Sequence, residues 1–139
     1  MKFIKNNLSE KFIINKYLKK LNFKNKGTFD FDNDGAYLDL KNKNYKLTVT
    51  TDNISENIDF FPNDDPKSVA QKITTINLSD IFAMGAVPHS YLLNLHLPNH
   101  INENWLNSFS NQLKKIQNKY GFYLLGGDLS KSNKLIVSS

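Results

Sequence analysis

The sequence predicts an α+β domain in which helices pack against one face of a sheet, and three observations support this prediction. The chain has 139 residues, a length that allows one domain and leaves little room for a second. Its hydrophobic content of 40%, with 12% aromatic residues, is enough for an ordinary core. Helix-like and strand-like patterns alternate in the order helix, hairpin, helix, strand, helix, strand, strand. We therefore expect residues 1–139 to form a single domain.

The first predicted elements are a helix and a hairpin. Asn7, followed three residues later by Glu10, resembles a capping box that opens a helix through Leu21. The apolar residues of this helix that share one face are Ile14, Tyr17, Leu18 and Leu21. Tyr37–Leu40 and Tyr45–Thr51 indicate two strands joined by a polar turn at 41–44.

The middle of the chain contains a long connection, a helix and a strand. Residues 52–64 show no helical period and form a connection of the kind that often carries function. Asp65 caps the next helix, Pro66 occupies its first position, and Gly85 ends it after Met84. Ser90–Leu97 alternates as a strand does.

The last predicted elements are one helix and two strands. Asn102 caps the helix and Gly121 stops it. Its apolar stripe consists of Trp105, Phe109, Leu113, Ile116 and Tyr120. Phe122–Leu125 and Leu135–Val137 are the final strands.

Charge and cysteine content exclude several classes of function. The chain carries 18 basic and 13 acidic side chains, and all 18 basic side chains are lysines. Without cysteine there are no disulfides, zinc–thiolate sites, iron–sulfur clusters or cysteine nucleophile. Without arginine, a phosphate group must be held by lysine, backbone N–H groups or a metal ion.

The sequence also indicates where the protein works and which partners it lacks. Its apolar runs are far shorter than the roughly 20 residues that span a bilayer, and the N-terminus lacks the apolar stretch of a signal peptide. We therefore expect a cytoplasmic protein with no membrane partner. The lysines are spread over the chain without a basic–aromatic stripe, so we expect no nucleic-acid partner.

One aspartate lies on the inward stripe of the predicted helix 66–84. The apolar positions of that stripe are Val69, Ile73, Ile76, Ala83 and Met84, and Asp80 falls among them. Burying a carboxylate costs several kcal/mol unless a cation or hydrogen-bond donors compensate. Either Asp80 reaches water or a backbone amide near the helix end, or it faces a cation.

Three further acidic segments fall at the ends of predicted elements: Asp32–Gly35, Thr50–Asp52 and Gly126–Asp128. Each is also compatible with an ordinary turn. Hydroxyl and carboxylate oxygens are hard ligands suited to magnesium, and two glycines let a backbone approach a ligand closely. Together with Asp80, these segments favour an oxygen-only magnesium cluster for nucleotide phosphates. The Gly-rich Walker pattern is absent, which excludes a P-loop enzyme.

These segments resemble the thiamine-monophosphate kinase family, in order and at family spacing from about Lys11 to the last residue. The similar stretches are Thr50–Asp52, Phe60–Pro66, Asn77–Pro88, Leu92–Pro98, Trp105–Leu106 and Gly126–Asp128. Asn77–Pro88 is shared with a wider superfamily that includes aminoimidazole ribonucleotide synthetase and selenophosphate synthetase, whereas Thr50–Pro66 and Leu92–Pro98 favour the thiamine enzyme. The resemblance implies a mixed sheet with helices on one face, as in the N-terminal domain of the aminoimidazole ribonucleotide synthetase-like proteins.

The resemblance further implies an activity and its site. The family transfers the γ-phosphoryl group of ATP directly onto thiamine monophosphate, with Mg²⁺, and pairs as a homodimer through the sheet with ATP near the interface. The residues that match its magnesium ligands are Asp34, Thr50, Thr51, Asp52, Asp80 and Asp128. Gly127 and Asp128 match part of its ATP site.

The chain departs from the family pattern at two places. Asp32–Asp34 stands where the family usually has Gly-Asp-Asp, and the second aspartate is kept. Asp59 stands where the family has a substrate-contacting histidine, so Asp59 is our candidate for substrate binding. A carboxylate near a phosphate substrate would repel it unless a metal intervenes. The chain's histidines, His89, His96 and His100, do not replace that residue in sequence, and we expect His96 on a strand and the other two in loops.

The length of the chain differs from that of the family, because family members are longer and carry a second domain. We therefore expect either a fragment or a truncated relative, inactive by itself. Two alternatives stay open. One is another ATP-dependent synthetase of the superfamily, which Asp59 favours, and the other is a non-catalytic dimerisation module or lysine-rich nucleic-acid binder.

Overall fold

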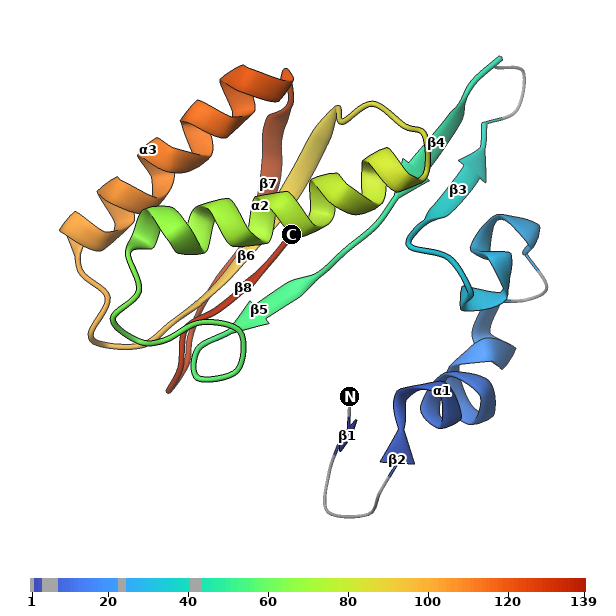
Figure 1. Ribbon diagram of the computed structural model, residues 1–139, viewed down its shortest axis with the longest axis horizontal. Helices are drawn as coiled ribbons and strands as arrows, with labels where there is room; N and C mark the ends of the chain where they lie inside the picture. The colour runs from blue at the N-terminus through green and yellow to red at the C-terminus, as the bar shows by residue number, and fades with distance from the viewer. Residues whose placement is uncertain (1, 4–7, 23–24, 41–43) are drawn as a thin grey trace. The chain divides into compact units, whose positions relative to one another are not determined.

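The structure, a computed structural model of the chain, describes residues 2–3, 8–22, 25–40 and 44–139. The chain divides into two compact units, unit 1 at Met1–Thr50 and unit 2 at Thr51–Ser139 (Figure 1).

Unit 1 is built from short elements. They are β1 (Lys2–Phe3), β2 (Leu8–Ser9), α1 (Glu10–Ile13), a π-helical segment (Ile14–Leu18), 3₁₀ segments (Lys19–Asn22 and Lys26–Phe31), β3 (Ala36–Asp39) and β4 (Lys46–Val49). The strands pair antiparallel, β1 with β2 and β3 with β4. The predicted hairpin is therefore confirmed, although β4 ends at Val49 rather than at Thr51.

The helix near the N-terminus differs from the prediction. Asn7 lies outside the described residues, and the cap is Ser9, whose hydroxyl accepts a hydrogen bond from the Phe12 N–H at 3.2 Å. The prediction of one continuous α-helix to Leu21 is wrong, because the chain passes into π-helical and 3₁₀ turns after Ile13. Its apolar face stays largely exposed, with Leu21 at 60%. A helix gains most of its stability from packing such a face, so this segment lacks the main force that keeps a helix regular.

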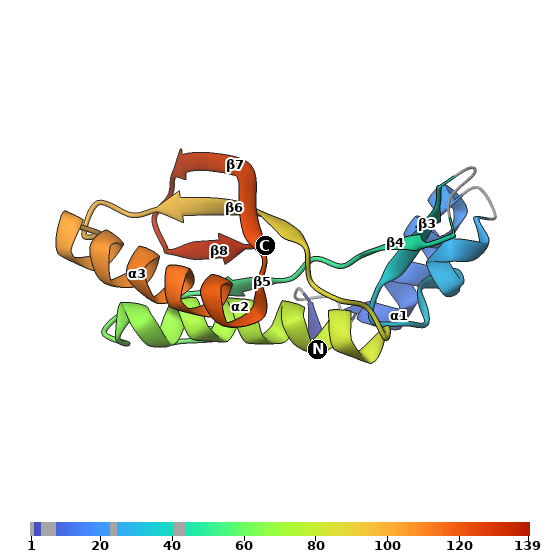
Figure 2. The ribbon, with the colours of Figure 1, turned by 90° about the horizontal axis from the view of Figure 1, so that it is seen from above.

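Unit 2 contains one mixed sheet and two long helices. Its elements are β5 (Asn53–Ser55), α2 (Pro66–Ala83), β6 (Ser90–Leu97), α3 (Glu103–Tyr120), β7 (Tyr123–Lys131) and β8 (Ile136–Ser138). The strand order is β5-β8-β6-β7, with β6 and β7 parallel and the other pairs antiparallel. Within unit 2, α2 and α3 lie on the same face of this sheet (Figure 2). The predicted α+β fold, with a mixed sheet and helices on one face, is confirmed.

The ends of both long helices follow the sequence signals. The Asp65 carboxylate accepts a hydrogen bond from the Lys67 N–H at 3.0 Å, and the Asn102 side chain accepts one from the Trp105 N–H at 3.0 Å. Gly121 follows α3 in the left-handed conformation, with φ of 74°. These local signals fix where α2 and α3 begin and where α3 stops.

The core belongs to unit 2: every buried apolar side chain among the described residues lies there. The larger cluster contains Ile54, Phe60, Val69, Ala70, Ile73, Leu95, Phe109, Leu113, Leu135 and Val137. A smaller cluster contains Leu78, Ile116 and Phe122. Fully burying a side chain of this size contributes about 1.5–3 kcal/mol, so these contacts dominate the folding of the sheet and its helices.

Two strand assignments need correction. Residues 52–64, which we predicted to be a connection, contain a strand, because Asn53–Ser55 pairs with β8. Only Ile54 of these three residues is buried, and a pattern this short does not reveal a strand in the sequence. Gly126–Asp128 does not follow the strand predicted at Phe122–Leu125 but lies inside β7. Both glycines have positive φ, 158° at Gly126 and 155° at Gly127, and both pair with β6. In the described part of the chain, no helix is long and apolar enough to cross a membrane.

Candidate functional site

Two carboxyl groups meet in unit 2, at Asp52 and Asp80. Asp52 lies directly before β5, and Asp80 lies in the last turn of α2. Both side chains are half-buried. Burial, followed by a hydrogen bond with Asp80 and the charge of Asp80, raises the pKa of Asp52 above its ordinary value. Two carboxylates this close cannot both stay ionised at low cost unless they share a proton or a cation.

Backbone hydrogen bonds fix the position of Asp52. Its N–H donates to the Ser139 carbonyl at 3.0 Å, and the Ser139 N–H donates back to the Asp52 carbonyl at 3.0 Å. The Thr51 hydroxyl donates to the same Ser139 carbonyl at 3.0 Å. Ser139, which follows β8, therefore holds the segment that carries the Asp52 carboxylate. Because the Thr51 hydroxyl donates its proton to Ser139, its oxygen lone pairs can accept a hydrogen bond or bind a cation.

Two predicted ligands, Asp34 and Thr50, are brought together in unit 1. The Thr50 hydroxyl donates to the Asp34 carbonyl at 3.0 Å, and the Asp34 N–H donates to the Asn33 side chain at 3.0 Å. The turn before β3 is thus tied to the end of β4. Asp34 and Thr50 are exposed or half-exposed, with hydroxyl and carboxylate oxygens, a donor set that suits a hard cation.

Asp128 lies apart from the Asp52–Asp80 pair. It pairs with Asn94, which pairs with Ser138, which pairs with Asn53, so one polar row crosses the sheet from edge to edge. At about 4.8 Å per strand, three strand spacings separate Asp128 from β5 by roughly 14 Å. Over the residues that the structure describes, no three His, Cys, Asp or Glu side chains gather around one point. Of the predicted magnesium ligands in unit 2, Asp52 and Asp80 lie together and Asp128 lies on a different strand, while Asp34 and Thr50 belong to unit 1.

The two glycines before Asp128 differ in their surroundings. A Cβ at Gly127 would lie 1.8 Å from the Leu93 carbonyl oxygen, so only glycine allows β7 to lie this close to β6. A Cβ at Gly126 would meet nothing within 4 Å. Glycine at position 127 is therefore required by the close packing of β7 against β6, whereas a side chain at position 126 would face open space.

Asp59 has a local structural role. Its carboxylate oxygen Oδ2 accepts a hydrogen bond from the Ser55 N–H at 2.7 Å, and its N–H donates to the Ser55 carbonyl at 2.9 Å. The Lys72 ammonium group on α2 donates to the Asp59 carbonyl. Asp59 thereby closes the turn after β5 and joins it to α2.

The sequence reasoning missed two polar features of unit 2. Glu56 is 6% exposed; its Oε2 accepts a hydrogen bond from the Leu135 N–H at 3.1 Å and lies 3.6 Å from His100 Nε2. Asn94 joins Asp128 in the polar row. The signal for Asn94 was present in the sequence, because alternation along Ser90–Leu97 places it opposite the buried face.

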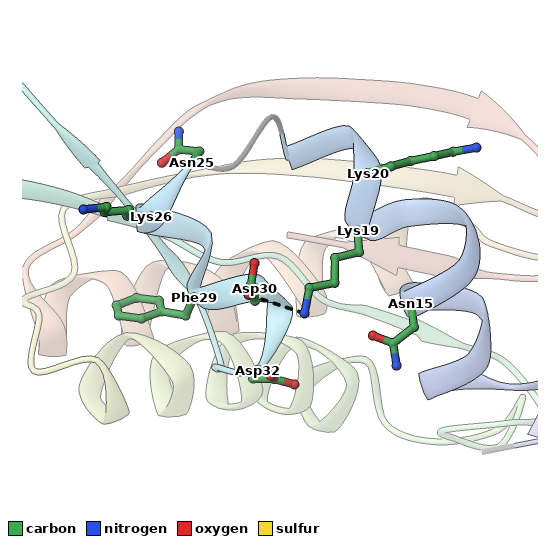
Figure 3. Close-up of a pocket in the computed structure, with 8 residues that line it drawn as sticks. All are labelled: Asn15, Lys19, Lys20, Asn25, Lys26, Phe29, Asp30 and Asp32. Atoms are coloured by element: carbon green, nitrogen blue, oxygen red, sulfur yellow. Dashed lines mark ion pairs between the residues drawn. The ribbon is translucent and has the colours of Figure 1, made fainter.

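A pocket of about 740 Å³ lies within unit 1 (Figure 3). Its lining consists of Asn15, Lys19, Lys20, Asn25, Lys26, Phe29, Asp30 and Asp32. Lys19 Nζ lies 3.4 Å from Asp30 Oδ2, while Lys20 and Lys26 point away from that ion pair (Figure 3). The lysines therefore do not converge on one point, and none of the predicted magnesium ligands lines the pocket.

Relatives in sequence are thiamine-monophosphate kinases. The chain is 44% identical over 95 residues to "Thiamine-monophosphate kinase" of Haemophilus influenzae, an alignment that covers 68% of this chain and 29% of that protein. It is 39% identical over 127 residues to the enzyme of Buchnera aphidicola subsp. Schizaphis graminum, covering 91% of this chain and 39% of that protein. The chain thus spans well under half the length of the curated relatives it matches.

Solved structures of the same kind are similar in fold. "AaThiL complexed with AMPPCP and TMP" matches with a TM-score of 0.83 and 29% identity, covering 98% of this chain and 42% of that one. Thiamine monophosphate kinase from Aquifex aeolicus matches with a TM-score of 0.69 and 27% identity, covering 87% of this chain and 41% of that one.

The family assignment rests on the greater part of the chain. Residues 32–139, which include all of unit 2, match "AIR synthase related protein, N-terminal domain". The mixed sheet, its two helices and the aspartates at Asp52 and Asp80 all fall within this match. The chain therefore belongs to the AIR synthase related family and carries that family's N-terminal domain.

Proposed function

We propose that this chain is the N-terminal, ATP- and Mg²⁺-binding part of a thiamine-monophosphate kinase. The reaction is transfer of the γ-phosphoryl group of ATP to thiamine monophosphate, which gives thiamine diphosphate. The observation that carries the proposal is the carboxylate pair of Asp52 and Asp80 in a chain up to 44% identical to enzymes of that name. A related structure that was solved with AMPPCP and TMP supports the two substrate classes.

The donor groups of the pair fit magnesium. Mg²⁺ takes oxygen ligands and commonly binds through one or two carboxylates together with substrate phosphates. When bound, it would neutralise charge on the triphosphate and align the donor with the acceptor. Asp52 and Asp80 repel each other when both are ionised, and a cation between them would remove that cost.

The other predicted ligands enter the proposal with separate roles. Thr51 would add a hydroxyl oxygen beside Asp52, since its proton is donated to Ser139. Asp34 and Thr50, which meet within unit 1, stay proposed oxygen ligands there, and Asp128 on β7 stays a proposed carboxylate ligand in unit 2. We assign Gly127 and Asp128 to ATP binding.

Asp59 enters the proposal as a substrate-binding residue for the acceptor. Its Oδ2 is occupied by Ser55, so a contact with thiamine monophosphate would use Oδ1. Because a carboxylate repels a phosphate, this contact would need a cation between them.

The proposed protein is a cytoplasmic homodimer with no nucleic-acid or membrane partner. Support for pairing through the sheet comes from unit 2, in which α2 and α3 cover one face and β7 forms an edge (Figure 2). On that edge strand, Leu125 is 64% and Leu129 is 71% exposed. Unpaired edges and exposed leucines are features that a second copy would cover.

The test is a phosphorylation assay on the full gene product. With thiamine monophosphate and Mg-ATP, we expect thiamine diphosphate, measured by chromatography of the thiamine esters. Asp52→Asn and Asp80→Asn should abolish turnover and leave the circular dichroism spectrum unchanged. Asp65→Asn is the matched control, because asparagine caps α2 as well as aspartate does. No thiamine diphosphate from the wild-type protein would refute the proposal.

A second candidate is another ATP-dependent synthetase of the same superfamily. The observation that favours it is Asp59, whose carboxylate is engaged with Ser55. A panel of acceptor substrates separates the two candidates. The kinase would transfer the γ-phosphoryl group of ATP to thiamine monophosphate, whereas the synthetase would consume ATP only with a different acceptor. A protein that binds neither ATP nor Mg²⁺ and still dimerises would be the non-catalytic module.

A further inference from the structure

A buried glutamate, Glu56, lies directly after β5 in unit 2 and is bound on two sides. Its N–H donates to the Leu135 carbonyl at 2.9 Å, and its Oε2 accepts a hydrogen bond from the Leu135 N–H at 3.1 Å. The same oxygen lies 3.6 Å from His100 Nε2, in the segment between β6 and α3. Glu56 therefore joins the end of β5 to the residue before β8 and to the segment after β6.

The turn that Glu56 belongs to, residues 55–60, carries Asp59 (Figure 1). The Asp59 N–H donates to the Ser55 carbonyl at 2.9 Å, and Asp59 Oδ2 accepts a hydrogen bond from the Ser55 N–H at 2.7 Å. Asn57, next to Glu56, has a φ of 66°, in the left-handed region that costs free energy for a residue with a side chain. Such a conformation persists where the surrounding structure holds the chain in place, and Glu56 provides that hold.

Two anchors fix this turn against the rest of unit 2. From the helix side, the Lys72 ammonium group on α2 donates to the Asp59 carbonyl. From the strand side, the hydrogen bonds of Glu56 tie the turn to Leu135. Loss of the Glu56 side chain would leave the buried Leu135 N–H without its acceptor and release the strand-side anchor. The direction of the Asp59 carboxylate therefore depends on Glu56.

We infer that Glu56 is a positioning residue for the acceptor substrate and acts through Asp59. This inference rests on the proposed function, which assigns Asp59 to thiamine monophosphate. A group that orients a substrate loses up to about a hundredfold in rate when it is displaced by about 1 Å. Asp52 lies before β5 and Glu56 after it, so four residues of extended chain, roughly 13 Å, separate Glu56 from the proposed magnesium ligand. The effect of Glu56 should therefore fall on the acceptor and spare Mg-ATP.

The test is steady-state kinetics of the full gene product, with thiamine monophosphate and Mg-ATP varied in turn. Glu56→Ala should raise the KM for thiamine monophosphate by about tenfold or more and leave the KM for Mg-ATP within about twofold of wild type. Glu56→Gln keeps an oxygen acceptor for the Leu135 N–H and should restore the KM for thiamine monophosphate to within about threefold of wild type. Ile116→Val weakens the smaller core cluster and is the stability control, with both KM values unchanged.

A double-mutant cycle tests whether Glu56 acts through Asp59. Asp59→Asn keeps an oxygen for the Ser55 N–H and removes the charge. In that background, Glu56→Ala should change the KM for thiamine monophosphate by less than about threefold, because the group that it positions is already altered.

The outcomes separate this inference from the proposed function. A wild-type protein that makes no thiamine diphosphate refutes the proposed function, and the inference falls with it. If wild type is active, an unchanged KM in Glu56→Ala, an equal rise of both KM values, or an undiminished effect in the Asp59→Asn background overturns the inference alone. Glu56→Asp, whose shorter side chain withdraws the carboxylate from Leu135, repeats the comparison should Glu56→Ala fail to fold.

Discussion

At the scale of single residues, the chemistry of unit 2 depends on where carboxylates are placed. Asp52 and Asp80 face each other, and the pKa of Asp52 is raised, first by burial and then by Asp80. Glu56 is more deeply buried, yet it is satisfied by the Leu135 N–H and by His100. Asp52 and Asp80 therefore form a carboxyl pair with a raised pKa at Asp52, while the buried Glu56 carboxylate has a structural role.

The first prediction concerns Asp52 and pH. The raised pKa means that the folded chain binds this proton more tightly than the unfolded chain. The contribution of protonated Asp52 to the free energy of unfolding is complete below pH 3.8, the ordinary pKa of an aspartate. It is lost as the pH rises through the raised pKa of Asp52 in the folded state. In magnesium-free buffer at neutral pH, Asp52→Asn should therefore melt at a higher temperature than wild type, and the two should converge in acid.

Differential scanning fluorimetry of both proteins across this pH range provides the measurement. Adding Mg²⁺ at neutral pH should raise the melting temperature of the wild-type protein and leave that of Asp52→Asn unchanged. A variant that melts below wild type in magnesium-free neutral buffer would show that the pair is not repulsive.

The second prediction concerns Glu56. Glu56→Ala leaves the buried Leu135 N–H without its acceptor and should lower the free energy of unfolding by about 1–3 kcal/mol. Glu56→Gln keeps an oxygen acceptor and should lose less. Urea denaturation monitored by circular dichroism measures both, and equal losses in the two variants would mean that the charge, not the hydrogen bond, matters.

At the scale of elements, β7 illustrates how close packing of strands requires glycine. Its nine residues pair with β6 through a register shift after Tyr91, and both Gly126 and Gly127 lie within the paired region. Gly127 pairs with Leu93, and its lack of a side chain allows β7 to lie close to the Leu93 carbonyl.

The third prediction follows from this contact. In Gly127→Ala, the added methyl group would overlap the Leu93 carbonyl, so β7 must shift away from β6, at a cost of about 1–3 kcal/mol. Gly126→Ala faces open space and should lose less, through backbone strain alone. Thermal unfolding of the two variants makes the comparison, and a Gly126→Ala protein less stable than Gly127→Ala would contradict it.

At the scale of the whole molecule, the two units differ in how much apolar surface they bury. The buried apolar side chains of the described residues all lie in unit 2, whereas unit 1 exposes large apolar side chains along most of its elements. Those of unit 1 are Phe12, Tyr17, Leu18, Leu21, Phe29, Phe31, Leu38, Leu40, Tyr45, Leu47 and Val49. Burial of apolar surface is the main force for folding, so the stability of the chain resides in unit 2.

The fourth prediction tests this difference. A fragment of residues 51–139 should unfold cooperatively and keep the circular dichroism of a mixed α+β protein, because its core is complete. A fragment of residues 1–50 should show no cooperative transition. An unfolded 51–139 fragment would mean that unit 1 contributes to that core.

Much of unit 2 could be predicted from local signals. Asp65 and Pro66 set the start of α2, Asn102 and Gly121 set the bounds of α3, and alternation over most of its length marked β6. These signals act within one element and need no partner. The three-residue strand β5 carries too few residues to show alternation, and it exists because β8 pairs with it.

Unit 1 was predicted less well, for a related reason. The spacing of Ile14, Tyr17 and Leu21 indicates an amphipathic helix, yet these residues fall in π-helical and 3₁₀ turns. Helical periodicity predicts a regular helix only when the apolar face has a surface to pack on. Within unit 1, that face is largely exposed.

The sequence by itself determined the fold class, the limits of the long helices and the set of acidic and hydroxyl side chains suited to a hard cation. Composition also left phosphate binding to lysine, backbone and metal, because the chain has no arginine. Only the tertiary structure decided which of those side chains meet. It joined Asp52 to Asp80 and placed Asp128 in an edge strand beside the open face, since strand order and register are set by pairing between segments far apart in the chain.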